Sequence, residues 1–418
     1  MSAALLSYAE ATGIVLKYAR TRSAQPPAVR RLPLGATVSR VLAQPIVADQ
    51  DQPPFARSTR DGFACRSAEA NMHAPLPVAG VTHAGDAPPP PLHAGRCWQI
   101  MTGAPVPAGA DAVAMLEHVE HAEGRVRLLP PRKLAAGENI VARAAQARAG
   151  DVLLSPGTRI TAAQIALAAS CGYAELAVYT RPHVAILTTG DELVPVEAVP
   201  GPGKIRNSNA PMLAALVAAA GGEPYVLPTA ADTSEALDTA IAAALRADLL
   251  LISGGVSAGT HDLVEPALAR FGAQFHFTGV RIQPGKPLVF GEVPRPASPS
   301  LPLFGLPGNP VSSAATFHLF AASVLAALSG AHSLGPHFVA ARLAGHVKTK
   351  PGLTRFLPAW CNFAATGAES AAELPAVEPV SWHGSGDLAA FARANCFLVV
   401  PEDAASLAPG TLVCILVF

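Results

Sequence analysis

The part of the sequence that most restricts the fold is residues 183–330, where short apolar runs alternate with segments of helical pattern. The expected strands are Val184–Leu187, Tyr225–Leu227, Leu249–Ile252, Leu288–Phe290 and Leu301–Phe304, and the expected helices are Pro211–Ala220, Ser234–Leu245, Leu263–Phe271 and one that starts near Pro310. Short, fully apolar strands between helices indicate a mostly parallel sheet that is covered on both faces. We therefore predict a doubly wound α/β domain at 182–330, in which the Pro-rich segment 293–302 is a surface loop.

Three loops follow strands of this predicted sheet, and all three are rich in glycine. They are TTGDEL (188–193), SGGVSAGTHD (253–262) and GLPGNP (305–310). The carboxyl ends of parallel strands meet at one edge of a sheet, and such domains bind ligands there. Glycine lets the backbone approach a ligand closely, and free N–H groups at the start of a helix bind phosphate. One such loop means little because turns are rich in glycine, but three on one edge predict a phosphate-containing ligand.

Helical segments flank the α/β domain on its N-terminal side. Residues 1–25 have a helical pattern, and Thr161 with Gln164 forms the capping-box pattern of a helix start. We assign residues 1–44 and 143–181 to a helical linker domain.

Two further regions have the composition of β structure. Residues 45–142 are rich in proline and glycine and contain short apolar stretches such as Cys97–Met101, which indicates a β-rich domain. The sequence after residue 331 predicts a C-terminal β domain, similar to a barrel, over 331–418. Its expected strands are Phe338–Leu343, Phe356–Trp360, Phe397–Val400 and Val413–Phe418. The whole chain is therefore predicted to be an α/β multidomain protein.

Charge and composition exclude two classes of partner. The 418 residues include 30 basic and 30 acidic side chains, so no overall field attracts nucleic acid or an anionic membrane. Charged residues make up only 14% of the chain, against about 25% in a typical soluble domain. This balance is typical of a compact globular protein rather than a disordered one.

One apolar stretch, Val311–Gly330, is long enough to be considered as a membrane span. It contains Ser312, Ser313 and His318 and has no flanking basic or aromatic anchors, so a buried core helix fits better. The N-terminus lacks the basic segment of a signal peptide. The six cysteines form no C-x-x-C pair and are typical of core thiols in a reducing cytosol. We expect a soluble, cytoplasmic protein.

Carboxylates occur in and beside the glycine-rich loops. Asp232 and Asp262 each stand three residues before a glutamate, which is the pattern of a capped helix start. Capping alone explains these two acids, and solvated charge alone explains Asp191 and Glu192. In the functional interpretation, acids that converge beside a phosphate hold a hard cation such as Mg²⁺. Lys286 of the QPGKP segment would then offset phosphate charge, and otherwise it is an ordinary surface lysine.

Taken together, these motifs resemble those of the molybdopterin molybdenumtransferase family, which includes bacterial MoeA and the gephyrin E domain. The α/β domain carries, in family order and spacing, TTGDEL, SNA (208–210), SGGVS-x-G-x-x-D, PGKP and GLPGNPVS. The other regions carry matching segments: PPFARSTRDGFA (53–64), IMTGAPVPAGAD (100–111), GENI (137–140), PG…RF (351–356) and HGSG…NCF (383–397). The resemblance spans nearly the whole chain, and the set is far more specific than any one motif.

The resemblance implies a homodimeric enzyme with an elongated, four-part subunit. Such an enzyme takes adenylylated molybdopterin and molybdate, inserts molybdenum at the dithiolene and releases AMP with the help of Mg²⁺ or another divalent cation. Its site lies between the α/β domain of one subunit and the β-rich domain of the other. Its protein partners would be a MogA-like adenylyltransferase or a molybdoenzyme.

The resemblance also implies which residues form the site. The catalytic carboxylates would be Asp61, Glu192, Asp232 and Asp262, of which the last three would hold the metal. The substrate-binding residues would be Thr102, Thr189, Gly190, Asp191, Ser208, Asn209, Ser253, Gly254, Gly255, Ser257, Gly259, Gln283, Pro284, Gly285, Lys286, Pro307, Gly308, Asn309 and Ser385.

The chain departs from the family pattern where charged groups are expected. Ala145 and Gln146 stand in place of an acidic pair after GENI, Gln283 replaces a lysine, and Arg60 replaces a methionine. An amide cannot supply the charge that a carboxylate gives to a cation or a proton transfer. Two functions therefore stay open. One is an active molybdenum insertase, and the other is a divergent, catalytically impaired paralogue that binds molybdopterin or its nucleotide as a carrier or scaffold.

Overall fold

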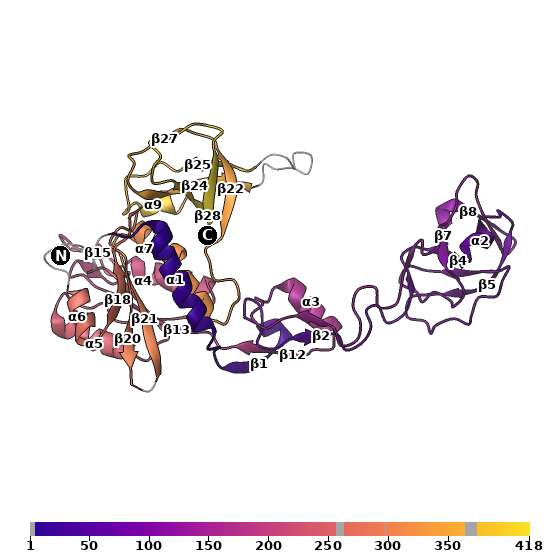
Figure 1. Cartoon of the computed structure of the whole chain (residues 1–418), viewed down its shortest axis with the longest axis horizontal. Coiled ribbons are helices and arrows are strands. Elements are labelled where there is room, and N and C mark those ends of the chain that lie inside the picture. The colour runs from indigo at the N-terminus through magenta and orange to yellow at the C-terminus, as the bar shows by residue number, and fades with distance from the viewer. Residues whose placement is uncertain (1–4, 256–262, 297, 364–373) are drawn as a thin grey trace.

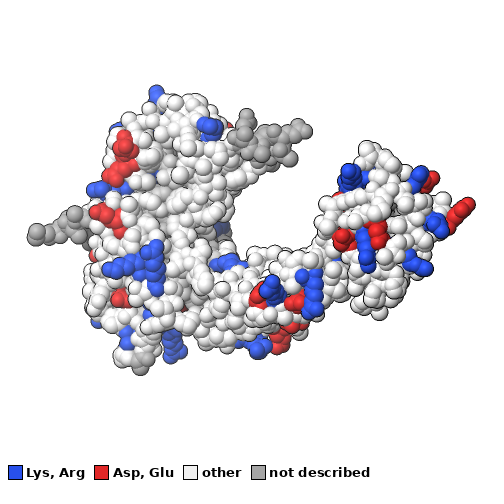
Figure 2. Space-filling view, turned by 45° about the vertical axis from the view of Figure 1, so that its right-hand side comes forward, with Lys and Arg blue, Asp and Glu red and all other residues white. Residues whose placement is uncertain are grey.

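The chain is elongated in the computed structural model, which describes residues 5–255, 263–296, 298–363 and 374–418. An α/β domain and a C-terminal barrel lie together at one end, and a β-rich distal lobe lies at the other (Figure 1). A thin arm of short strands connects them. Figure 2 shows an open notch between the distal lobe and the rest of the molecule, with basic and acidic side chains scattered in small groups.

The α/β domain is built on a sheet of six strands in the order β16, β13, β17, β21, β20, β18. Their bounds are β13 His183–Thr188, β16 Glu223–Val226, β17 Leu249–Ser253, β18 Gln274–Thr278, β20 Val289–Arg295 and β21 Ser298–Leu306. The pairs β16–β13, β13–β17 and β17–β21 are parallel, and β20 is antiparallel to both of its neighbours, β21 and β18. The prediction of a mostly parallel sheet is confirmed.

Helices cover both faces of this sheet. One face carries α5 (Ser234–Ala244) and α6 (Val264–Arg270), whose core includes Ala185 and Leu187. The core on the other face includes Val184 and Ile186. It carries α1 (Tyr8–Ser23), α4 (Asn209–Ala219), α7 (Pro310–Thr316), the π-helical turn η3 (Phe317–Ala321) and α8 (Ala322–Leu328). Alternate residues of β13 therefore enter opposite cores, which fixes the register of the strand.

The apolar helix over Pro310–Leu328 lies inside the protein. It is long and apolar enough to cross a membrane, but 78% of its apolar window is buried in the fold. Its partners include α1, which packs along α8. The prediction of a core helix is confirmed.

The prediction of a surface loop at 293–302 is wrong, because most of this segment belongs to the hairpin of β20 and β21. Val293 and Leu301 pair across the hairpin and are both buried in the core. The prolines of this segment had indicated a turn, but burial of these two apolar side chains stabilises the hairpin instead. The edge strand β18 was also missed.

The arm consists of two short antiparallel pairs and a helix. Strand β1 (Val29–Pro33) pairs with β12 (Glu175–Tyr179), and β2 (Ile46–Val47) pairs with β11 (Val152–Leu154). Helix α3 (Ala162–Ser170) begins after Thr161, whose N–H donates to Gln164 Oε1 at 3.0 Å. The predicted capping box is therefore confirmed.

The distal lobe holds a half-barrel sheet in the order β7, β4, β6, β5, β9, β8. The lobe comprises β3 Arg57–Ser58, β4 Gly62–Cys65, α2 Ser67–Ala70, β5 Leu76–Thr82, β6 Cys97–Ile100, β7 Ala112–Met115, η2 Leu116–His118, β8 Val119–Ala122, β9 Arg125–Leu128 and β10 Ile140–Val141.

The C-terminal region is a closed barrel of five strands, because β26 pairs back to β24. Its strands are β22 Phe338–Leu343, β24 Thr354–Asn362, β25 Ala376–Pro379, β26 Cys396–Val400 and β28 Leu412–Val417. Strand β19 (Ile282–Gln283) of the α/β domain pairs with β24, and Phe356, Phe397 and Leu416 join the core around α8. Barrel and α/β domain are thus packed against each other.

A buried histidine lies where these two bodies meet. His318 of η3 stacks on the C-terminal residue Phe418, with ring centroids 5.3 Å apart. Phe418 in turn contacts Phe391 and Phe397 of the C-terminal region. Burial lowers the pKa of His318 from 6.5 to about 4, so the folded protein holds this ring neutral.

We predict that His318→Phe reduces the loss of stability on acidification. The unfolded chain takes up a proton on His318 below about pH 6.5 and the folded chain only near pH 4, so stability falls as the pH drops through this window. Between pH 7 and 5 the wild type should lose about 2 kcal/mol more than His318→Phe in urea denaturation. His337→Gln, at an exposed position, should behave as the wild type, and equal losses in all three proteins would contradict the prediction.

Candidate active site

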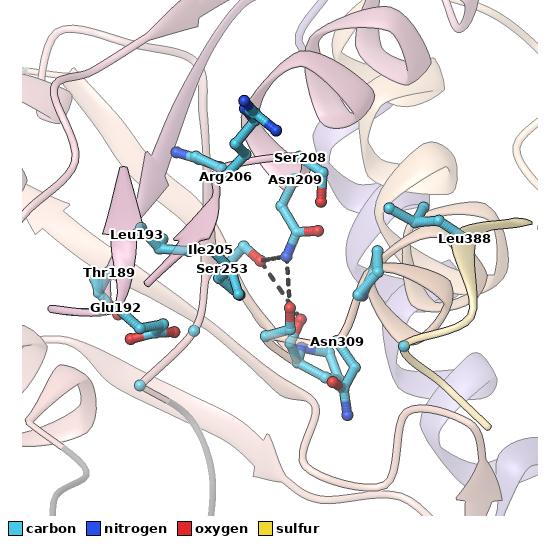
Figure 3. A pocket seen from close by; sticks show the side chains of 18 of the residues that line it. Thr189, Glu192, Leu193, Ile205, Arg206, Ser208, Asn209, Ser253, Asn309 and Leu388 are labelled. Atoms are coloured by element: carbon cyan, nitrogen blue, oxygen red, sulfur yellow. Dashed lines mark hydrogen bonds between the residues drawn. The ribbon is translucent and has the colours of Figure 1, made fainter. Parts of the chain in front are cut away.

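A cavity of about 880 Å³ lies at the carboxyl edge of the central sheet, between the α/β domain and the C-terminal region (Figure 3). All three predicted glycine-rich loops contribute to its wall. It is lined by Thr189, Gly190, Glu192, Leu193, Ile205, Arg206, Asn207, Ser208, Asn209, Asp232, Ser253, Gly254, Gly255, Pro287, Pro307, Gly308, Asn309, Pro310, Gly386 and Leu388.

Asn209, the first residue of α4, joins two of the loops. Its Nδ2 donates to Ser253 Oγ at 2.8 Å and to the Gly308 carbonyl at 2.6 Å (Figure 3). Ser253 Oγ also lies 3.2 Å from the hydroxyl of Ser313 in α7. The ends of β17 and β21 and the start of α4 are therefore held together by one hydrogen-bond network.

Two buried polar atoms on the cavity wall have no hydrogen-bond partner among the described residues. They are Asn209 Oδ1 and Thr189 Oγ1. A buried polar atom without a partner is costly, so a bound ligand or water would complete both.

The C-terminal region reaches the cavity through the segment around Ser385. Asn309 Nδ2 donates to Ser385 Oγ at 2.9 Å, and the Ser385 carbonyl accepts from the Val311 N–H at 3.0 Å. The N–H groups of Gly308 and Asn309 donate to no described atom. Ser385 does not line the cavity itself, although Gly386 does.

The loop after β13 brings Glu192 to the cavity. Its carboxylate folds over Gly190, where an added Cβ would lie 2.5 Å from Glu192 Oε2. Gly190 also has a φ of +141°, which L side chains rarely adopt. Glycine is therefore required at this position for the carboxylate to lie as it does.

Asp232 lines the cavity and does not cap the following helix, so the capping interpretation of this acid is wrong. The N-cap of α5 is Thr233, whose side chain accepts from the Ala236 N–H. Asp232 exchanges backbone-to-carboxylate hydrogen bonds with Asp191, at 3.2 and 3.4 Å. Asp191 supports the loop in this way but is not part of the cavity wall.

The predicted metal ligands are only partly described. Glu192 and Asp232 both line the cavity, while Asp262 lies outside the described residues, as do Ser257 and Gly259. The described part of the chain holds no cluster of three His, Cys, Asp or Glu side chains that could bind a metal. Two carboxylates on one cavity fit Mg²⁺ if the ligand supplies phosphates, because Mg²⁺ usually takes one or two carboxylates together with substrate phosphates.

The segment QPGKP runs between this cavity and a second one. Pro287 lines the first cavity, and Gln283 lines a groove of about 470 Å³. Pro284 and Gly285 are buried between them, and Lys286 is exposed. The remaining residues of the groove are Lys348, Thr349, Lys350, Arg355, Leu357 and Trp382. Among the described residues, the groove therefore gathers three cations and no carboxylate.

Asp61 and Thr102 lie in the distal lobe, far along the molecule from the cavity (Figure 1). Asp61 Oδ1 accepts from the Thr102 N–H at 2.6 Å and from its hydroxyl at 2.7 Å. These hydrogen bonds hold the pKa of Asp61 below its ordinary value. The structure brings these two residues together, but not to the cavity of the same chain.

Several residues of the cavity were missed from the sequence. Leu193, Ile205 and Leu388 form apolar parts of the wall, and Arg206 adds a cation. Asn207 positions the start of α4, because its Nδ2 donates to Thr188 Oγ1 at 2.8 Å and its Oδ1 accepts from the Ala210 N–H. Only the neighbouring SNA motif could have pointed to Arg206 and Asn207. Leu193, Ile205 and Leu388 come from separate segments that only the folded chain brings together, so no sequence motif pointed to them.

Family models match along nearly the whole chain. The MoeA N-terminal region (domain I and II) matches residues 6–172, a probable molybdopterin binding domain matches 185–327, and the MoeA C-terminal region (domain IV) matches 340–418. Together with the fold, these matches define a MoeA-type multidomain protein.

Curated relatives and a solved structure agree with this assignment. A molybdopterin molybdenumtransferase from Nostoc sp. is 38% identical over 316 residues, 74% of this chain and 72% of the relative. One from Bacillus subtilis is 33% identical over 391 residues, 91% of this chain and 87% of the relative. The crystal structure of a molybdopterin biosynthesis MoeA protein from Pyrococcus horikoshii is 28% identical with a TM-score of 0.77, covering 99% of this chain and 100% of that one. The chain belongs to the molybdopterin molybdenumtransferase family.

We predict that Thr233→Ala and Asp232→Asn differ in their effect on stability. Loss of the cap at Thr233 should lower the free energy of unfolding by about 1 kcal/mol. Asp232→Asn should change it by less than about 0.5 kcal/mol, since this side chain does not cap the helix. Both values are measured by urea denaturation, and a larger loss for Asp232→Asn than for Thr233→Ala would restore the capping role to Asp232.

Proposed function

We propose that the chain is an active molybdopterin molybdenumtransferase, which inserts molybdenum from molybdate into adenylylated molybdopterin and releases AMP. The observation that carries this proposal is the meeting of three glycine-rich loops and two carboxylates at one cavity. The names of the relatives support the same activity. We also propose that it acts in the cytoplasm, between a MogA-like adenylyltransferase and a molybdoenzyme.

The cavity has separate parts for a phosphate and for a ring. The N–H groups of Gly308 and Asn309 stand at the start of the long helix from Pro310 and suit an anionic oxygen. Leu193 and Ile205 offer an apolar wall for a flat ring system, and Ile205 is 57% exposed. Asn209 Oδ1 would accept a hydrogen bond from an N–H group of that ring.

The two carboxylates that line the cavity, Glu192 and Asp232, suit a divalent cation. We propose that Glu192 and Asp232 hold Mg²⁺, with Asp262 as a third ligand. The cation would neutralise phosphate charge, which is what cleavage of a phosphoanhydride needs more than a protein nucleophile. The protein's own part is to fix the phosphate against the start of α7 and to hold the nucleotide in place.

The cationic groove gives a place for the second substrate. Molybdate is a dianion, and Lys348, Lys350 and Arg355 surround the groove without a carboxylate. The groove and the main cavity are joined by the segment from Gln283 to Pro287. Gln283 can donate a hydrogen bond to an oxyanion although it has lost the charge of a lysine.

The loss of the acidic pair at Ala145 and Gln146 does not disrupt the loop that carries it. The Gln146 N–H donates to the Gln52 carbonyl at 2.8 Å, and Arg143 pairs with Asp51 at 2.6 Å. A carrier or scaffold with the same binding sites is the alternative function, which the names of the relatives do not favour. It would bind the nucleotide but release no AMP.

We further propose that the chain works as a homodimer whose sites are shared. Asp61 and Thr102 cannot reach the cavity of their own chain, because the arm holds the distal lobe away from it (Figure 1). In a two-fold dimer the lobe of one chain can cover the cavity of the other. Asp61 and Thr102 would then face Glu192 and Asp232 of the second chain.

We predict that Asp232→Asn slows AMP release from adenylylated molybdopterin by roughly 100-fold in the presence of molybdate and Mg²⁺, since it removes a charge that holds the cation. The matched control is Glu235→Gln, which removes an exposed acid three residues away that does not line the cavity. It should keep wild-type activity. Nucleotide binding by the wild type without any AMP release would instead support the carrier function.

We predict that two inactive variants, Asp61→Asn and Asp232→Asn, regain activity when they are mixed and exchange subunits. A mixed dimer has one shared site with both defects and one with none. Random exchange makes about half of the dimers mixed, so activity should reach about one quarter of the wild type. Exchange is followed by native mass spectrometry. If mixed dimers form and activity does not return, the shared-site model fails.

A further inference from the structure

Three arginines converge where the arm meets the α/β domain. Arg40 and Arg159 come from loops of the arm, and Arg181 comes from the connection between β12 and β13. They line a small cavity together with Gly221, which follows α4, and Ser329, which follows α8. Figure 1 shows β12 and β13 at this junction. The cavity therefore lies between two parts of the molecule and far from both cavities described above.

These arginines form no ion pair within the described part of the chain. None of them lies within ion-pair distance of a carboxylate among the described residues. Arg40 donates to the Tyr179 carbonyl at 2.9 Å, and Arg159 donates to two backbone carbonyls at 3.2 and 3.3 Å. Arg181 makes no hydrogen bond or ion pair with the described part of the chain. The buried Nε atoms of Arg40 and Arg181 are also without a partner there.

The electrostatics of the cluster are unfavourable as it stands. Burial, and then the charge of Arg181, lower the pKa values of Arg40 and Arg159. For Arg40, the charge of Arg30 lowers the pKa further and the carboxylate of Glu223 opposes the shift. One of the carbonyls that accepts from Arg159 belongs to Ala220 at the end of α4, where the helix dipole is negative. Such dipoles and the nearby carboxylate of Glu223 offset part of the charge, but the cluster of partly buried cations keeps a net positive charge.

We propose that this cluster is a binding site for a tetrahedral oxyanion of the phosphate or sulfate class, which clamps the arm to the α/β domain. Guanidinium groups match the oxygens of such anions with paired N–H donors. The cavity has a volume of about 10 Å³, which is room for about one oxygen atom or water. One oxygen of the anion would enter it, and the others would meet the half-buried arginines at its mouth.

Because the site lies between the arm and the α/β domain, a bound anion would hold these two parts together. Arg40 and Arg159 belong to the arm, while Gly221 and Ser329 belong to the α/β domain. An anion held between them would fix the direction of the arm, and the arm carries the distal lobe. The inference rests on the cluster itself and holds whatever reaction the main cavity catalyses.

The test is the binding of sodium sulfate to the full-length protein by calorimetry, in a buffer of low chloride at pH 7, repeated with sodium phosphate. The wild type should bind both anions, and Arg181→Gln should bind them at least about tenfold more weakly. Arg125→Gln, which removes an exposed arginine of the distal lobe, is the matched control and should bind as the wild type. Without sulfate, Arg181→Gln should melt at the same temperature as the wild type or higher, because Arg181 has no partner to lose.

Two outcomes would overturn the proposal. The first is equal binding of sulfate by the wild type and Arg181→Gln, which would mean that sulfate binds elsewhere, or no binding by either protein, which would mean that the cluster is not an anion site. The second is a change of oligomeric state in Arg181→Gln with no change in sulfate binding. The cluster would then pair with carboxylates of a second copy of the chain.

Discussion

The parallel pairing of β13, β17 and β21 is the constraint on which the rest of the site depends. Their register places Thr188 beside Ser253 and Ser253 beside Leu306 at one edge of the sheet. Three loops that are far apart in the sequence therefore start next to one another. Slipping one strand by a residue would turn Val184 and Ile186 toward the wrong core, so burial on both faces keeps the loops in register.

A second level of organisation comes from the way that the C-terminal barrel is packed. Phe356, Phe397 and Leu416 share the core around α8, and the bond from Asn309 to Ser385 closes the contact at the cavity. The main cavity and the cationic groove both lie along this packed seam. The distal lobe, in contrast, is not packed against the α/β domain and is connected to it only by the arm (Figure 1). The fold thus combines two cavities between closely packed domains with a remote lobe that only the arm connects to them.

The sequence predicted the features that depend on local patterns. Apolar runs gave the strands of the central sheet, and the glycine-rich loops gave most of the main cavity. Features that depend on distant contacts could not be predicted in this way. The apolar wall of Leu193, Ile205 and Leu388 forms only when three separate segments meet. The cap at Thr233 was missed because Asp232 also fits the capping pattern, and only the backbone decides between them.

We propose that the glycine-rich edge of the α/β domain binds the phosphorylated pterin substrate. A crystal structure of the protein with adenylylated molybdopterin and Mg²⁺ would show where this ligand lies. We expect phosphate oxygens against the N–H groups of Gly308 and Asn309, with the cation beside Glu192 and Asp232. A ligand bound only on the C-terminal barrel, with the 880 Å³ cavity at the sheet edge left empty, would contradict it.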